Sequence, residues 1–122
     1  MAKSRIKGIT IEIDGNTTGL QESLSDVNKK SIDLQSELRD VERLLKFDPG
    51  NTEALAQKQE LLARQIQNTE EKLQRLKDAQ EQVDQKFSSG DIGEEQYRAF
   101  RREIEFTERE LENLQNSLQD VD

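Results

Sequence analysis

The sequence predicts a mainly helical protein made of long coiled-coil-type helices, which form an antiparallel helical hairpin or a three-helix arrangement behind a short N-terminal strand. Two observations predict this fold. Apolar residues recur at alternating steps of three and four in three stretches, and the breaker segments 47–52 and 88–93 separate those stretches. A period of 3.5 residues places one narrow apolar stripe on a helix, which is buried only against another such stripe. The pattern therefore indicates assembly rather than chemistry.

Composition favours a thin helical seam over a thick globular core. Of the 122 residues, 31% are hydrophobic and 36% are charged, which is a small apolar supply for a chain of this length. Cysteine, histidine and tryptophan are absent. Imidazole acid–base catalysis and zinc binding through Cys or His are therefore excluded. We expect no enzyme activity, no catalytic residue, no cofactor and no metal site.

The charge balance argues against nucleic acid as a partner. The chain carries 26 acidic and 18 basic side chains, for a net charge of -8. A surface of that sign repels phosphates, so we expect no direct binding of nucleic acid. The local basic run Lys3, Arg5 and Lys7 fits a solvated strand edge and is assigned no site. No apolar run approaches the roughly 20 residues of a membrane span, so none is expected in this segment.

Residues 1–17 are predicted to form an N-terminal strand and turn. Ile9, Ile11 and Ile13 alternate with polar residues, and an Asp-Gly-Asn turn signal follows them. A lone strand leaves its backbone groups unpaired. It therefore needs a partner in another copy, in another protein or in a segment that the pattern does not reveal. An extended arm that is ordered only by contact fits the residues equally well.

The remaining residues, 18–122, form the predicted coiled-coil region, with helices over residues 18–46, 52–87 and 94–121. The first helix is expected to begin near Thr18, because Thr18 and Gln21 have the spacing of a capping box. The first break contains Pro49, which has no amide proton and disfavours helical geometry in the residue before it. A turn or bend is therefore predicted at that point.

The candidate functional residues are those of the helix-packing seam, the positions that follow the heptad on each helix. They are Leu20, Leu24, Val27, Ser31, Leu34, Leu38, Val41, Leu45, Leu55, Leu62, Ile66, Thr69, Leu73, Leu76, Val83, Phe87, Tyr97, Phe100, Ile104, Leu111, Leu114 and Leu118.

A turn about Gly50 would let the first two helices pack as an antiparallel hairpin. Seam positions whose numbers add to 100 then face each other, and Ser31 meets Thr69. Polar residues within a seam cost stability but fix the register, so this coincidence favours the hairpin. The third helix can then pack back along the second, with Phe87 near Tyr97.

An extended parallel coiled-coil oligomer is the alternative architecture. Each helix would then pair with the same helix of other copies, and the two breaks would act as joints. The helices laid end to end would extend about 130 Å, whereas the hairpin would be less than half as long. The heptads alone do not separate these arrangements, and we expect a homo-oligomer.

Two segments of the chain resemble one protein family. The first is the opening G-I-T-I-E-I-D-G-N-T-T-G-L, residues 8–20. The second is the pattern L-x-x-D-P-G-N-T-x-x-L-x-x-K-Q-x-L-L, residues 45–62, which follows the amphipathic helix. Together they resemble the N-terminal region of tail tape measure proteins from long-tailed bacteriophages and prophages. The resemblance covers most of the chain, and the second segment is its more specific part.

The resemblance implies a structural role. Tape measure proteins occupy the lumen of the assembling tail tube as extended helical oligomers, and their length sets the tail length. The resemblance therefore implies tail tube or tail assembly proteins as partners, a place in the phage tail, and synthesis in the bacterial cytoplasm. Family members are much longer, so this chain is expected to be part of a longer protein. A generic coiled-coil adaptor or a secreted helical-hairpin protein would show the same seam and stays an alternative.

Overall fold

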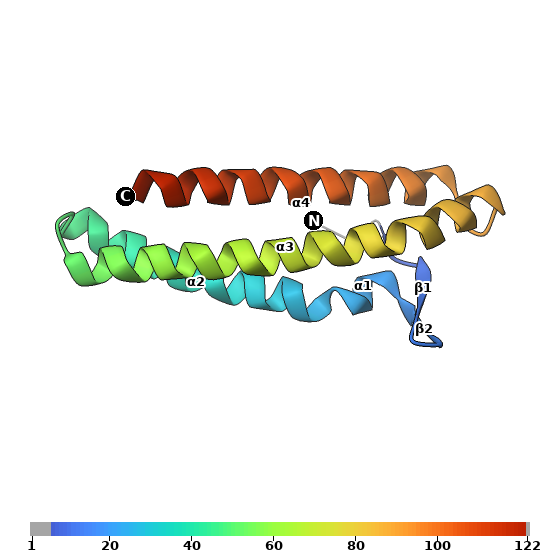
Figure 1. Ribbon diagram of the computed structural model, residues 1–122, viewed down its shortest axis with the longest axis horizontal. Coiled ribbons are helices and arrows are strands. Elements are labelled where there is room, and N and C mark those ends of the chain that lie inside the picture. The colour runs from blue at the N-terminus through green and yellow to red at the C-terminus, as the bar shows by residue number, and fades with distance from the viewer. Residues whose placement is uncertain (1–5, 122) are drawn as a thin grey trace.

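A computed structural model describes residues 6–121 and shows three long helices lying side by side, with a β-hairpin at one end (Figure 1). Helix α2 spans Ser25–Phe47, α3 spans Thr52–Ser88 and α4 spans Glu94–Val121. Helix α3 packs against both α2 and α4. The predicted fold class, mainly helical with the helices folded back on one another, is confirmed. The extended rod is not the arrangement found.

The two breaker segments form defined turns. At the first, the Asn51 side chain caps α3 by accepting a hydrogen bond from the Ala54 N–H over 2.9 Å. At the second, the Asp91 N–H donates to the Lys86 carbonyl over 2.8 Å and the Gly90 N–H donates to the Phe87 carbonyl over 3.1 Å. This pair of bonds, with a φ of 85° at Gly90, is the Schellman motif that ends many helices.

The predicted strand finds its partner in the segment that follows it. Strand β1, Thr10–Ile13, pairs antiparallel with β2, Asn16–Gly19. The connecting residues Asp14 and Gly15 both have positive φ, 52° and 80°. Two positive values match a type I′ turn, whose twist suits a two-residue hairpin. The strand partner that β1 needs is therefore β2, a segment that the alternation of apolar residues does not indicate.

The predicted capping box of Thr18 and Gln21 is not formed. Thr18 lies within β2, opposite Ile11, and is one residue away from the position that caps the first helix. The first helix, α1, spans Leu20–Ser23, and its N-cap is Gly19, which has no side chain for a capping bond. A break at Leu24 then separates α1 from α2. The Ser23 carbonyl at this break accepts a hydrogen bond from Arg75 of α3 over 2.9 Å.

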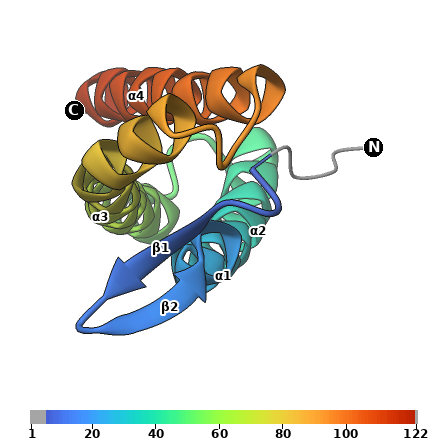
Figure 2. The ribbon, with the colours of Figure 1, turned by 90° about the vertical axis from the view of Figure 1, so that its right-hand side faces the viewer.

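The buried side chains form two clusters at different levels of the bundle. The base cluster lies near the hairpin and contains Ile6, Ile9, Ile11, Leu20, Leu24, Val27, Leu76, Ala79, Val83, Ile92, Ala99 and Phe100. The distal cluster contains Leu34, Val41, Ala54 and Leu61. Figure 2 looks along the helices from the hairpin end and shows β1 lying between β2 and α3. Lys3 and Arg5, the first two residues of the basic run, lie outside the described residues.

Candidate functional site

Every residue of the predicted helix-packing seam is buried or half-buried in the structure. The buried members are Leu20, Leu24, Val27, Leu34, Val41, Leu62, Thr69, Leu76, Val83 and Phe100. The half-buried members are Ser31, Leu38, Leu45, Leu55, Ile66, Leu73, Phe87, Tyr97, Ile104, Leu111, Leu114 and Leu118. The burial of these positions agrees with the predicted seam, and its role as a functional surface stays a prediction.

The seam packs most completely at the base of the bundle. Phe100 of α4 is 0% exposed and belongs to the base cluster, and Ile104 packs against that cluster. The rings of Phe87 and Tyr97 stack with their centroids 4.2 Å apart, as the sequence predicts. The Tyr97 hydroxyl also donates to Asp84 over 3.0 Å. Aromatic and polar contacts therefore join α3 and α4 beside their connecting turn.

Packing is less complete at the distal end. Leu38 and Leu45 of α2 pack against the distal cluster. In contrast, Leu111, Leu114 and Leu118 of α4 are only half-buried and are not members of either cluster. The apolar stripe of α4 therefore continues beyond the point at which its side chains are fully covered.

Ion pairs between α2 and α3 agree with a fold-back about Gly50. Lys58 Nζ lies 3.7 Å from Glu42 Oε2, and these two positions add to 100. The predicted facing of Ser31 and Thr69 stays a prediction. Thr69 is buried, whereas the Ser31 hydroxyl accepts a hydrogen bond from Gln35 of its own helix at 3.4 Å.

Four polar residues are buried among residues 6–121: Gln65, Asn68, Thr69 and Thr107. Asn68 donates to the Val27 carbonyl over 2.8 Å, and Thr107 donates to the Glu103 carbonyl over 2.7 Å. The Gln65 Oε1 atom is buried without a hydrogen-bond partner.

Gln65 and Asn68 are not among the predicted seam residues, because both lie off the single heptad stripe. Helix α3 is the middle helix and contacts α2 and α4 on different sides. It therefore buries more than one stripe. The only feature of the sequence that could have indicated the burial of Gln65 and Asn68 is that polar residues interrupt a wide buried face of α3.

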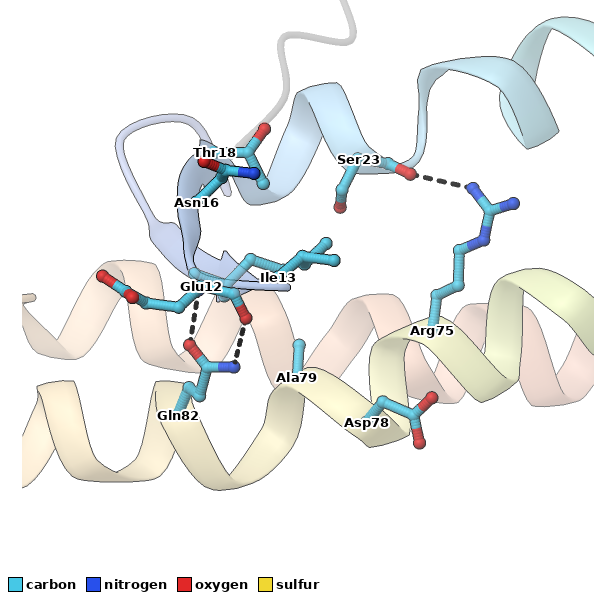
Figure 3. A pocket seen from close by; sticks show the side chains of 10 residues that line it. Glu12, Ile13, Asn16, Thr18, Ser23, Arg75, Asp78, Ala79 and Gln82 are labelled. Atoms are coloured by element: carbon cyan, nitrogen blue, oxygen red, sulfur yellow. Dashed lines mark hydrogen bonds between the residues drawn. The ribbon is translucent and has the colours of Figure 1, made fainter.

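A groove lies beneath the β-hairpin, between the hairpin, α1 and α3 (Figure 3). This hairpin groove has a volume of about 580 Å³ and is lined by Ile11, Glu12, Ile13, Asn16, Thr18, Ser23, Arg75, Asp78, Ala79 and Gln82. Ile13 lies over Ala79 and remains 44% exposed. The groove therefore has an apolar floor with polar groups around it.

Gln82 of α3 holds the hairpin in place. Its Oε1 accepts a hydrogen bond from the Glu12 N–H over 2.7 Å, and its Nε2 donates to the Glu12 carbonyl over 3.0 Å. The side-chain amide thus takes the place that a neighbouring strand would occupy.

Arg75 supplies the positive charge at the groove. It donates to the Ser23 carbonyl, to Asp26 over 2.7 and 3.2 Å, and to Glu71 over 3.2 Å. The hydrogen bonds from Arg75 lower the pKa of the Asp26 carboxyl, and those to Asp26 raise the pKa of the Arg75 guanidinium. Both shifts favour the charged pair, which fastens the α1–α2 break to α3.

The described residues contain no group of three or more acidic, histidine or cysteine side chains placed to hold a metal ion. Among the same residues, no helix is both long and apolar enough to cross a membrane.

The fold and its seam define a helical structural module. Its sequence is 30% identical over 112 residues to the probable tape measure protein of Lactococcus phage SK1. The match covers 92% of this chain and 11% of that relative, so the chain spans about a ninth of the relative's length. This relationship confirms the resemblance to tape measure proteins and supports a structural role in a phage. No protein-family model and no solved structure matches the chain.

Proposed function

We propose that this chain is the N-terminal region of a phage or prophage tail tape measure protein, which helps to set tail length and to assemble the tail tube. The observation that carries the proposal is the relationship to the phage SK1 protein across nearly the whole chain. The helical fold is compatible with it, because a helix converts residue number into length at a fixed rise of about 1.5 Å per residue.

The proposal includes the setting in which this region acts. The chain is a homo-oligomer in the assembling tail, its partners are tail tube or tail assembly proteins, and it is made in the bacterial cytoplasm before it enters the virion. The helix-packing seam is the surface that holds the region together. No reaction is assigned to this region, because the relative is a probable tape measure protein.

Deleting residues 20–121 in frame from the full-length gene, in the phage or prophage that encodes it, tests this function. The tails are then measured by electron microscopy. Shorter tails, or the loss of assembled tails, are expected. The point variant Gln67→Ala, on the exposed side of α3, is the control and should leave tails of normal length.

Tails of unchanged number and mean length after the deletion would contradict the proposal. They would instead favour the alternative in which the region is a generic helical adaptor.

A further inference from the structure

Within residues 6–121, strand β2 has an outer edge that pairs with no other strand. It is the outermost element in Figures 1 and 2, with β1 between it and α3. The Leu20 N–H donates to the Ile9 carbonyl over 2.8 Å, so these two residues form a hydrogen-bonded pair that extends the ladder. Because such pairs alternate along an antiparallel ladder, the N–H and C=O of Thr17 point away from β1.

The two edges of the hairpin differ in their hydrogen bonds. The outer edge of β1 is closed at Glu12 by the two hydrogen bonds from Gln82. Within residues 6–121, no hydrogen bond is formed by the backbone N–H or C=O of Thr17. Strand β2, with the sequence N-T-T-G, also lacks the lysine, proline or bulge that commonly protects an exposed edge.

The open edge adjoins the hairpin groove. Asn16 and Thr18 of β2 line the groove, together with Ile11 and Ile13 of β1. A third strand added along β2 would direct alternate side chains toward this same face of the sheet. An aliphatic side chain at such a position would lie beside Asn16 and Thr18, on the face that also carries the partly exposed Ile13.

The charges around the groove favour a basic occupant. The positive charge of Arg75 is already paired with Asp26 and Glu71. The other charged residues that line the groove are Glu12 and Asp78, whose carboxylates accept hydrogen bonds from the Thr17 hydroxyl over 2.9 Å and from Gln74 over 2.8 Å. With a net charge of -8, a second copy of this chain would be repelled, whereas a lysine- or arginine-bearing strand would be attracted.

We propose that β2 and the hairpin groove form a docking site for an extended basic segment of another protein. The segment adds to β2 as a third strand, forms hydrogen bonds with the backbone of Thr17, and places an aliphatic side chain in the groove. This site does not depend on the tape measure function, because it follows from the edge, the groove and their charge alone.

The test uses the whole chain and a capped seven-residue peptide of alternating lysine and valine as the probe. Amide hydrogen exchange by NMR is expected to show about tenfold slower exchange at the Thr17 N–H when the peptide is saturating. Thr17→Pro removes this donor and should abolish binding, whereas Thr17→Val keeps it and should bind the peptide. A peptide of alternating glutamate and valine should not bind.

A second arm does not depend on the folding of the proline variant. Two further peptides carry N-methyl groups either on all lysines or on all valines. Alternate residues of a docked strand point their N–H groups toward β2, so one of these peptides should bind and the other should not.

Three results would overturn the proposal. The first is an unchanged exchange rate at Thr17 with millimolar peptide. The second is binding of both methylated peptides. The third is protection of Thr17 that rises with protein concentration in the absence of peptide, because the edge would then pair with a second copy.

Discussion

Asn68 of α3 donates a hydrogen bond from its side-chain amide to the main-chain carbonyl of Val27 in α2, over 2.8 Å and inside the bundle. The bond joins positions that are 41 residues apart, and Val27 belongs to the base cluster. It holds two helices together through a backbone atom.

Replacing Asn68 with Ala should therefore destabilise the fold. The change removes a buried hydrogen bond and leaves space in the packed interior, so the free energy of unfolding should fall by about 1–3 kcal/mol. Urea unfolding followed by circular dichroism measures it. Asn116→Ala, on the exposed side of α4, is the matched control. Equal stability of the two variants would mean that the Asn68 bond adds nothing.

Gln65→Met should have the opposite effect. The Gln65 Oε1 atom is buried without a partner, and methionine is similar in length and flexibility but needs no hydrogen bond. The free energy of unfolding should rise by about 1 kcal/mol, since the desolvation cost of the amide disappears. Gln67→Met makes the same exchange at an exposed position of α3 and should change little. A destabilised Gln65→Met variant would indicate that the amide is satisfied in solution.

Two phenylalanines of α4 provide a direct comparison of burial. Phe100 is 0% exposed, and Phe106 is 66% exposed. Phe100→Ala should lower the free energy of unfolding by about 3–5 kcal/mol, because it empties the centre of the base cluster. Phe106→Ala should lower the free energy of unfolding by much less than Phe100→Ala does. Thermal and urea unfolding of both variants measure the difference, and similar losses would contradict the assignment of Phe100 to the core.

The Asp26–Arg75 pair should make the free energy of unfolding depend on pH in the acidic range. The pKa of Asp26 is lower in the folded chain than its ordinary value of 3.8, so the folded state binds its proton less readily than the unfolded state does. Its contribution is therefore present above that ordinary value and is lost as the pH falls through the folded pKa.

The Asp26→Asn variant should be less stable than the parent at pH 7, and the difference should shrink toward pH 2. Urea midpoints measured across this range test the prediction. Asp33→Asn, on the exposed side of α2 and away from Arg75, is the control. A difference that persists unchanged at pH 2 would exclude the charge of Asp26 as its cause.

Heptad spacing was sufficient to predict the long helices and the burial of their seam, because it reports directly which face of a helix is apolar. It did not predict β2, because Asn16, Thr17 and Thr18 carry no apolar alternation and Thr18 also fits a helix cap. The Asp14-Gly15 pair, a strong hairpin signal, was the evidence in favour of a second strand.

The additional buried positions of α3 were missed for a different reason. A single heptad describes a helix with one neighbour, whereas α3 contacts both α2 and α4. Small residues such as Ala54 and Ala79 are also buried there. Their side chains contribute little to an apolar pattern, yet they let two helices approach closely. The hairpin groove depends on the docking of β1 by Gln82, which no local pattern could show.

Helices α2 and α4 run in the same direction, with α3 opposed to both (Figure 1). A hydrogen bond from Gln35 to Glu110, at 3.4 Å, joins the two parallel helices. Three passes, unlike two or four, carry a chain from one end of a bundle to the other. The module therefore has a polarity: the hairpin and its groove lie at one end, and the turn between α2 and α3 lies at the other end, toward which α4 runs (Figure 1). In a longer chain, the hairpin would therefore lie at the end of the bundle opposite to the end toward which α4 runs.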